Sequence, residues 1–204
     1  MIHIVDYGLG NIRAFMTMYR RLGFEVVRAR TEDELRDASK IILPGVGAFD
    51  YAMQSLNDSG MRGMLDKLVV EDRVPVLGIC VGMQILADSS EEGKEAGLGW
   101  VPGRVRSFSS VPDSCALPMP HMGWNDVGPL EDDGVFKGLQ NDSRFYFLHS
   151  YFFECEHSSD ASARTLYGLE FDCAVRRGNV YGVQFHPEKS HDWGAALLKN
   201  FAEL

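Results

Sequence analysis

The sequence predicts an α/β protein in which a mostly parallel central sheet is covered by helices on both faces. Through the first half of the 204 residues, short apolar runs alternate with segments of helical periodicity, as in right-handed βαβ units. From Gly99 onward, short strands and frequent turns replace this pattern, which indicates an additional antiparallel segment. No internal repeat or low-complexity linker divides the chain, so we expect a single domain over residues 1–204.

The expected strands of the first half are apolar runs that end in turn residues: Ile2–Asp6, Phe24–Arg28, Lys40–Leu43 (closed by Pro44-Gly45) and Val74–Ile79. Between them, apolar residues recur at the helical spacing i, i+3, i+4, i+7 in two segments: Ile12, Phe15, Met16 and Tyr19, then Met61, Met64, Leu65 and Leu68. A helix and its flanking strands form each βαβ unit, so the fold expected here is a three-layer αβα arrangement.

The second half has fewer elements with a clear signature. A turn at Arg177-Gly178-Asn179-Val180 predicts a hairpin that pairs Cys173–Arg177 with Val180–Phe185. The periodic segment from Trp193 to Leu204 predicts a terminal helix. The stretch from Ser107 to Ala116 is rich in Ser and Pro, and we expect a mobile loop there.

Composition excludes several classes of function. The formal net charge of -9 argues against nucleic acid or an anionic membrane surface as the main partner. No apolar run is long enough to cross a bilayer, and the N-terminus has no signal-peptide pattern. The four cysteines show neither CxxC pairing nor metal-like spacing, so a reduced, cytoplasmic location is expected, with no metal: Cys80, Cys115, Cys155 and Cys173.

The segment 76–84 (VLGICVGMQ) carries the strongest signal for chemistry. An apolar strand runs into Gly-Ile-Cys-Val-Gly and then into helix-forming sequence, which is the thiol version of a nucleophile elbow. Such a turn exposes one side chain at a helix N-terminus, where the thiolate of Cys80 is favoured over the thiol. The alternative is that Cys80 is a small buried apolar residue, as most free cysteines are.

A second segment, 182–190 (GVQFHPEKS), supplies the partners that a cysteine nucleophile needs. It delivers His186 as a base and Glu188 as the carboxylate that fixes the tautomer of the base. In an extended chain, residues two apart point to the same side, which lets the carboxylate reach the imidazole. The alternative is a surface loop with an ordinary ion pair. The presence of Cys80 favours a Cys-His-Glu triad.

Several candidate segments fall at the carboxyl ends of predicted parallel strands, where ligands bind in open α/β sheets. They are Asp6-Tyr7-Gly8, Pro44-Gly45, Cys80 and His186. Gly8-Leu9-Gly10 imitates the start of a dinucleotide fingerprint, but Arg13 stands where the third glycine belongs. A nucleotide cofactor is therefore not expected.

Six motifs carry a family resemblance over essentially the whole chain. GICVGMQ (78–84) and QFHPEKS (184–190) resemble the two signatures of class I (triad) glutamine amidotransferases. Four further motifs resemble the glutaminase subunits of imidazole glycerol phosphate synthases: DYGLGN (6–11), LPGVGAF (43–49), HMGWN (121–125) and YFLHSY (146–151). Val81 and Met122 depart from the commoner residues of these motifs, and neither is expected to affect the chemistry.

The resemblance implies a flavodoxin-like, three-layer αβα fold and a role for each matching residue. Cys80, His186 and Glu188 form the catalytic triad, which splits glutamine into glutamate and ammonia through a thioester. The oxyanion and substrate-binding residues are Gly45, Val46, Gly47, Val81, Gln84, His149, Ser150 and Tyr151. The residues expected to face a partner are Tyr7, Asn11, Trp124, Tyr146 and Lys189.

The resemblance also implies a partner, a (β/α)₈-barrel cyclase subunit that receives the ammonia within a heterodimer. The expected products are imidazole glycerol phosphate and an aminoimidazole carboxamide ribotide (AICAR), in histidine biosynthesis, with no cofactor. One alternative is a paralogue that supplies ammonia for amidino sugars of surface polysaccharides such as O-antigen. Another is a catalytically silent binding subunit that kept the fold, which the intact Cys80, His186 and Glu188 disfavour.

Overall fold

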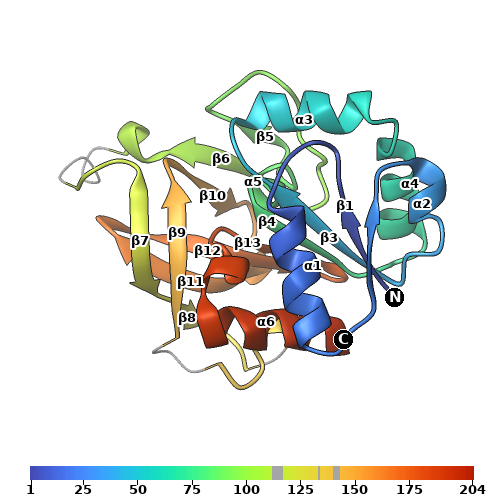
Figure 1. Ribbon diagram of the computed structural model, residues 1–204. Helices are drawn as coiled ribbons and strands as arrows, with labels where there is room; N and C mark the ends of the chain where they lie inside the picture. The colour runs from blue at the N-terminus through green and yellow to red at the C-terminus, as the bar shows by residue number, and fades with distance from the viewer. Residues whose placement is uncertain (112–116, 133, 140–142) are drawn as a thin grey trace.

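The computed structural model describes residues 1–111, 117–132, 134–139 and 143–204 (Figure 1). In these residues one eleven-stranded sheet runs in the order β2-β1-β3-β4-β13-β12-β10-β6-β5, with β11 paired to β12 and β8 paired to β11. The part from β2 to β13 is parallel and has the strand order of flavodoxin-like folds. The predicted α/β class, with a mostly parallel sheet and an antiparallel addition, is confirmed.

The strands of the parallel part are buried, as expected for strands covered on both faces, except for the edge strand β2, in which Arg28 is exposed. They are β1 (Ile2–Val5), β2 (Val26–Ala29), β3 (Lys40–Gly45), β4 (Val76–Cys80) and β13 (Val180–Val183).

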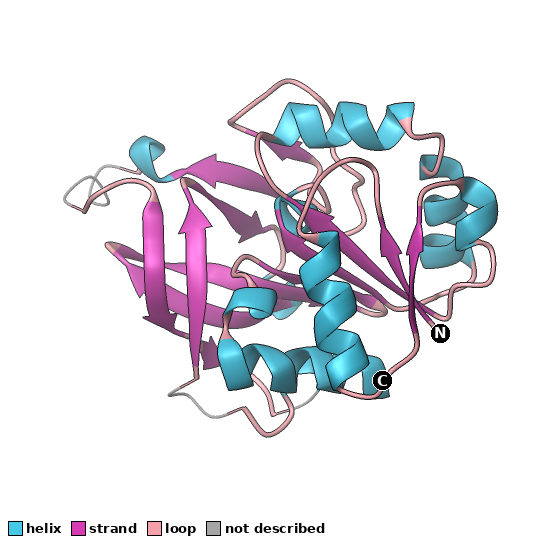
Figure 2. Cartoon of the chain, in the orientation of Figure 1, coloured by secondary structure: helices cyan, strands magenta, loops and turns pink. Residues whose placement is uncertain are grey.

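The predicted hairpin is present, since β12 pairs antiparallel with β13 through a turn at Gly178-Asn179. The remaining strands of this sheet are β5 (Ser89–Ser90), β6 (Gly103–Ser107), β8 (Gly128–Pro129), β10 (Tyr151–Cys155), β11 (Ala161–Tyr167) and β12 (Leu169–Arg177). A separate antiparallel ribbon, formed by β7 (His121–Asp126) and β9 (Arg144–His149), stands beside the sheet (Figure 2).

The helices lie on the two sides of the parallel strands: α1 and α6 contact each other on one side, and α2, α3 and α4 lie on the other (Figure 1). Their bounds are α1 (Ile12–Arg21), α2 (Glu32–Leu35), α3 (Phe49–Asp58), α4 (Arg62–Asp66), α5 (Val81–Gln84) and α6 (His191–Glu203). Short turns of other helix types are η1 (Lys67–Glu71), η2 (Phe108–Ser110), η4 (Gly134–Phe136), η5 (Ser158–Asp160) and η6 (Pro187–Lys189). No described helix has the length and apolar character that a membrane span requires.

Strand β3 continues two residues beyond its predicted end, through Pro44 to Gly45. Pro44 pairs with Ile79 of β4, whereas the pairing of β3 with β1 stops at Ile42. At Pro44 the strand therefore has a neighbour on one side only, so the missing N–H of proline removes no ladder hydrogen bond. This extension brings the Pro44-Gly45 backbone alongside Cys80.

Other boundaries also differ from the prediction. Strand β2 begins at Val26 rather than Phe24, because the Phe24 N–H bonds to the carbonyl of Tyr19 and closes α1. Helix α3 was not predicted at all. The segment from Ser107 to Ala116 ends β6 and forms η2 in its described part, while residues 112–116 lie outside the described residues.

Candidate active site

Cys80 occupies a strained turn between β4 and α5. Its backbone has φ 57° and ψ -115°, a region that a non-glycine residue adopts at a cost of about 1–3 kcal/mol. Its side chain is 4% exposed, yet it lines a pocket of about 290 Å³ at the carboxyl edge of the parallel strands. The elbow geometry expected from the motif is therefore present, and it holds the thiol where a ligand can reach it.

Gly82 allows this turn to pack tightly against β3. A Cβ atom at position 82 would lie 1.9 Å from the carbonyl oxygen of Leu43. Backbone atoms at that distance cannot relax without moving the strand. The close packing of the elbow against β3 therefore requires glycine at this position.

The change Gly82→Ala should therefore destabilise the fold by about 1–3 kcal/mol, the range typical of overpacking. The matched control is Gly63→Ala in α4, where a Cβ meets no atom within 4 Å and helix propensity should add about 0.5–1 kcal/mol of stability. Urea denaturation of the three proteins measures both effects. Equal midpoints for Gly82→Ala and the unchanged protein would contradict the packing argument.

His186 and Glu188 form a buried pair next to the cysteine. Nδ1 of His186 lies 3.0 Å from Oε1 of Glu188, and their side chains are 5% and 2% exposed. The two residues meet across the 3₁₀ turn η6, so the expected extended geometry is wrong although the contact exists. Burial opposes a charge on the ring, but the hydrogen bonds to Cys80 and Glu188 raise the pKa of His186 to about 9.

The pocket gathers ten of the residues that the sequence nominated, from segments far apart in the chain. They are Val46, Gly47, Cys80, Val81, Gln84, His149, Ser150, Tyr151, His186 and Lys189. Glu188 lies behind His186 and outside the lining, and Gly45 is buried next to Cys80 in the register of β3 and β4.

Sequence reasoning did not nominate four residues of this site. Glu92, Pro120 and Leu148 also line the pocket, and Glu92 is its one carboxylate among the described lining residues. Its Oε2 accepts a hydrogen bond from the Phe49 N–H, at 2.8 Å. Gln184 is fully buried, and its Nε2 donates to the sulfur of Cys80 at 3.8 Å. Gln184 lies within the same motif as His186, which is the signal that could have found it.

Tyr7 differs from the other residues expected to face a partner. It is 6% exposed, and its hydroxyl donates to the carbonyl of Pro44 at 2.7 Å. Burial, and to a smaller extent the charge of Cys80, raise the pKa of the Tyr7 phenol well above its ordinary value, so it remains a neutral donor. In this chain Tyr7 therefore anchors the backbone next to Gly45 from below the surface.

Trp124, Tyr146 and Lys189 gather at the surface beside the pocket. The Trp124 ring packs edge-on against Tyr146, whose ring lies 5.5 Å from the ammonium of Lys189. His191 stacks on Trp124 with ring centroids 5.3 Å apart. Asn11 is exposed at the start of α1.

The other cysteines lie away from this pocket. Burial raises the pKa of the thiols of Cys155 and Cys173 far above the ordinary value, which keeps both in the unreactive thiol form. Cys115 lies outside the described residues. Within the described part of the chain, no three His, Cys, Asp or Glu side chains are grouped to hold a metal ion.

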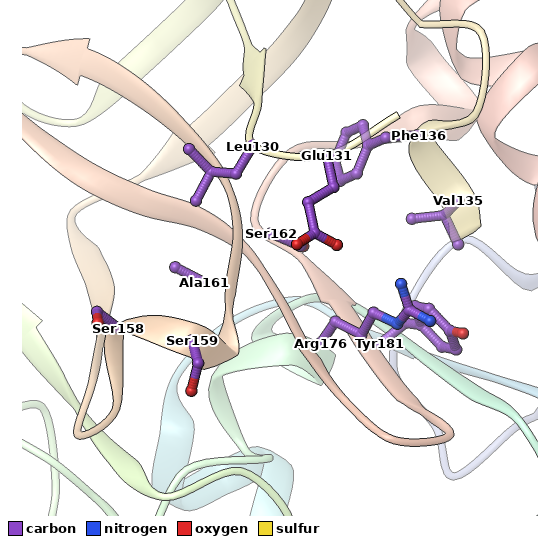
Figure 3. A pocket seen from close by; sticks show the side chains of 10 residues that line it. All are labelled: Leu130, Glu131, Val135, Phe136, Ser158, Ser159, Ala161, Ser162, Arg176 and Tyr181. Carbon is purple, nitrogen blue, oxygen red and sulfur yellow. The ribbon is translucent and has the colours of Figure 1, made fainter. Parts of the chain in front are cut away.

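A second hollow of about 240 Å³ lies between η4, η5 and the antiparallel strands (Figure 3). Leu130, Phe136 and Tyr181 line it together with Glu131 and Arg176. The Arg176 guanidinium lies 5.5 Å from the centre of the Tyr181 ring. None of the residues nominated from the sequence lines this hollow, so the pocket around Cys80 is the better candidate for catalysis.

Comparison with known proteins shows the family of the chain. The family model for glutamine amidotransferase class-I matches residues 3–204. Imidazole glycerol phosphate synthase subunit HisH of Bdellovibrio bacteriovorus is 65% identical over 204 residues, which is 100% of both chains. The chain belongs to the HisH family of class I glutamine amidotransferases. The HisH subunit of Leptospira borgpetersenii, another relative, is 50% identical over 100% of both chains.

Solved structures show the same fold as this HisH-family chain at much lower sequence identity. A crystal structure of a glutamine amidotransferase aligns with a TM-score of 0.78 and 22% identity, covering 99% of this chain and 97% of the other. The structure of PurLQS from Thermotoga maritima gives a TM-score of 0.74 at 20% identity, with the same coverage.

Proposed function

We propose that the chain is a single amidotransferase domain, residues 1–204, that serves as the glutaminase subunit of an imidazole glycerol phosphate synthase in histidine biosynthesis. The observation that carries this proposal is the strained Cys80 turn beside the buried His186–Glu188 pair, in a chain 65% identical to a HisH subunit. The pocket in front of Cys80 would hold glutamine, and ammonia would pass to a (β/α)₈-barrel cyclase. That partner would release imidazole glycerol phosphate and AICAR.

The first half of the reaction forms a thioester. The Cys80 thiolate attacks the side-chain amide carbon of glutamine, and the carbonyl π electrons move onto oxygen to give a tetrahedral oxyanion. Protonated His186 then gives its proton to the amide nitrogen as the C–N bond breaks and ammonia leaves. The backbone N–H of Val81, next to the nucleophile, is one donor for the oxyanion, and the glycine-rich backbone of residues 45–47 supplies another.

The second half returns the enzyme to its starting state. Neutral His186 takes a proton from water as the water oxygen attacks the thioester carbon. The C–S bond breaks and Cys80 regains its thiolate beside the imidazolium. The new carboxyl group releases its proton to solvent, and the product leaves as glutamate. Glu188 holds His186 through Nδ1, so that the other ring nitrogen faces the sulfur in both halves.

The raised pKa of His186 predicts the alkaline limb of the pH profile. The imidazolium, which delivers the proton to ammonia, is lost as pH rises through about 9, so kcat/KM for glutamine should fall above that pH. In Glu188→Gln the carboxylate that favours the charged ring is gone, and the limb should move to lower pH. Identical limbs in the two proteins would contradict the role assigned to Glu188.

Glu92 is placed to bind the α-ammonium of glutamine, because the carboxylate lines the pocket and is fixed by Phe49. We expect Glu92→Gln to raise KM for glutamine by about 10- to 100-fold, the effect of losing one charge-assisted hydrogen bond. The change in kcat should be smaller. The control is Glu95→Gln, whose carboxylate accepts from Gln54 outside the pocket. Equal KM values for all three proteins would exclude Glu92 from substrate binding.

Ammonia is a nucleophile only as the free base, so a glutaminase that serves a synthase benefits from a protected route to its partner. The exposed surface beside the pocket supports such docking: Val46, Met122 and Trp124 are 42%, 65% and 41% exposed. Exposed apolar side chains gathered at the mouth of a site are typical of interaction surfaces.

The test is glutamine hydrolysis by this chain alone, with its cognate barrel subunit, and with that subunit plus the aminoimidazole precursor nucleotide. Stimulation by the nucleotide, together with formation of imidazole glycerol phosphate, is the expected result. A rate of hydrolysis that the nucleotide does not change would leave the glutaminase chemistry in place and favour a sugar acceptor. An inactive complex would support a silent binding subunit and overturn the proposal.

A further inference from the structure

A continuous line of buried and partly buried hydrogen bonds runs from the candidate nucleophile to strand β7. Gln184 donates to the Cys80 sulfur and accepts from Nε2 of Gln84 at 2.9 Å. Gln84 also donates to the carbonyl oxygen of Tyr151 at 3.2 Å. The same carbonyl lies 2.7 Å from Nδ1 of His149. The Tyr151 carbonyl is therefore held from two sides, by Gln84 and by His149.

The line continues behind the pocket through a pair of histidines. Nε2 of His149 lies 2.8 Å from Nδ1 of His121, and Nε2 of His121 lies 3.3 Å from Nδ2 of Asn125. Asn125 ends the line, since its Nδ2 also donates to the carbonyl of Leu166 at 2.9 Å. Both imidazoles are buried, at 2% and 6% exposure.

These contacts permit one arrangement of protons. A carbonyl oxygen only accepts, so Nδ1 of His149 carries the hydrogen and its Nε2 must accept. His121 therefore donates from Nδ1 and accepts at Nε2 from the Asn125 amide. Burial lowers the pKa of His121 to about 4 and that of His149 to about 3, so both rings stay neutral near pH 7.

His121 is also held in place by packing. Its ring stacks against Phe147 and Tyr167, with centroids 4.6 Å and 4.0 Å apart. On strand β7 the exposure alternates, so that His121 and Asn125 face inward while Met122 and Trp124 face solvent. The strand thus carries the inner hydrogen bonds and the outer apolar surface on opposite faces.

We propose that His121, oriented by Asn125, is a positioning residue for glutamine binding, because it holds His149 in the tautomer that fixes the Ser150-Tyr151 edge of the pocket. Ser150 and Tyr151 line the pocket directly, whereas His121 does not. The role of His121 is therefore indirect and rests on the proposed glutaminase function of the pocket. It also makes β7 the element through which a partner seated on Met122 and Trp124 would steady the substrate site.

Two substitutions separate hydrogen bonding from packing. His121→Phe keeps an aromatic ring for stacking but has no donor, whereas His121→Gln keeps an N–H donor and loses the stacking. We expect His121→Phe to raise KM for glutamine about tenfold, as for one lost buried hydrogen bond, with kcat changed less than KM. We expect the KM of His121→Gln to lie much closer to that of the unchanged chain, because the donor is kept. His157→Gln, at an exposed site, is the matched control.

The assay uses the chain in complex with its cognate barrel subunit, and a second readout is independent of glutamine. Nitrogen-15 NMR of the imidazoles of the unchanged chain should show His149 as a neutral Nδ1–H tautomer, and His121→Phe should lose this single tautomer.

An Nε2–H tautomer of His149 in the unchanged chain would overturn the proposal, even if the variants failed to fold. So would an unchanged KM in His121→Phe, or equal defects in the Phe and Gln variants. If the unchanged complex does not hydrolyse glutamine, the glutaminase function fails while the NMR result still tests the tautomer.

Discussion

Replacing Cys80 by Ala should lower glutamine hydrolysis by at least ~10⁴-fold, because no covalent intermediate can form without the sulfur. The loss should appear in kcat, and KM should change little, since the other pocket residues remain. The backbone at this position has positive φ, which alanine adopts no more readily than cysteine, so the fold should keep its stability within about 1 kcal/mol. Steady-state assay of the partner-bound complex measures the effect.

A glutamine-mimicking electrophile gives an independent check of the same residue. It should label Cys80 and leave Cys155 and Cys173 unmodified, because burial keeps both of these thiols protonated. The matched control is Cys173→Ala, at a fully buried site away from the pocket. Labelling that persists in Cys80→Ala, or activity that survives that change, would exclude Cys80 as the nucleophile.

Replacing His186 by Gln should have the second largest effect, a fall in kcat of roughly 10³- to 10⁴-fold. Glutamine can accept or donate a hydrogen bond at this position but cannot carry a proton from one reacting group to another. The change also removes the positive charge beside the sulfur, which should slow the labelling of Cys80 near neutral pH.

The double variant Cys80→Ala/His186→Gln tests whether the two residues act in the same chemical step or independently. If the two residues act in the same step, the double variant should be no slower than Cys80→Ala alone. Losses that multiply would show that His186 acts independently of Cys80 and would contradict the triad.

The sequence was most informative where local chemistry dictates geometry. Cys80 is flanked by Gly78 and Gly82, where a Cβ atom would meet nearby backbone atoms, and Cys80 itself has the positive φ expected of the elbow. The apolar repeat of α1 likewise predicted the buried pair Phe15 and Tyr19. In both cases the information lies within about ten residues of chain.

Elements that depend on distant neighbours were harder to predict. Helix α3 is an exception: it was not predicted although its signal is local, since Phe49, Ala52, Met53 and Leu56 have helical spacing and are all buried. The extension of β3 through Pro44 depends on where β1 ends, and that boundary is a property of the assembled sheet.

The functional residues divide in the same way. Glu92 lies in a polar stretch without regular periodicity and reaches the pocket only because its segment folds over the start of α3. The contact of His121 with His149 requires the pairing of β7 with β9, 28 residues along the chain. No local pattern encodes either contact, since both arise from packing between elements.

The most direct test of the central claim is mass spectrometry of the partner-bound complex, quenched in acid during turnover of glutamine. A peptide containing Cys80 should carry the mass of glutamine less ammonia, and the adduct should be sensitive to hydroxylamine, as a thioester is. The adduct should be absent in Cys80→Ala. Turnover that proceeds without any adduct on Cys80, or with the adduct on another residue, would contradict the proposed thioester mechanism.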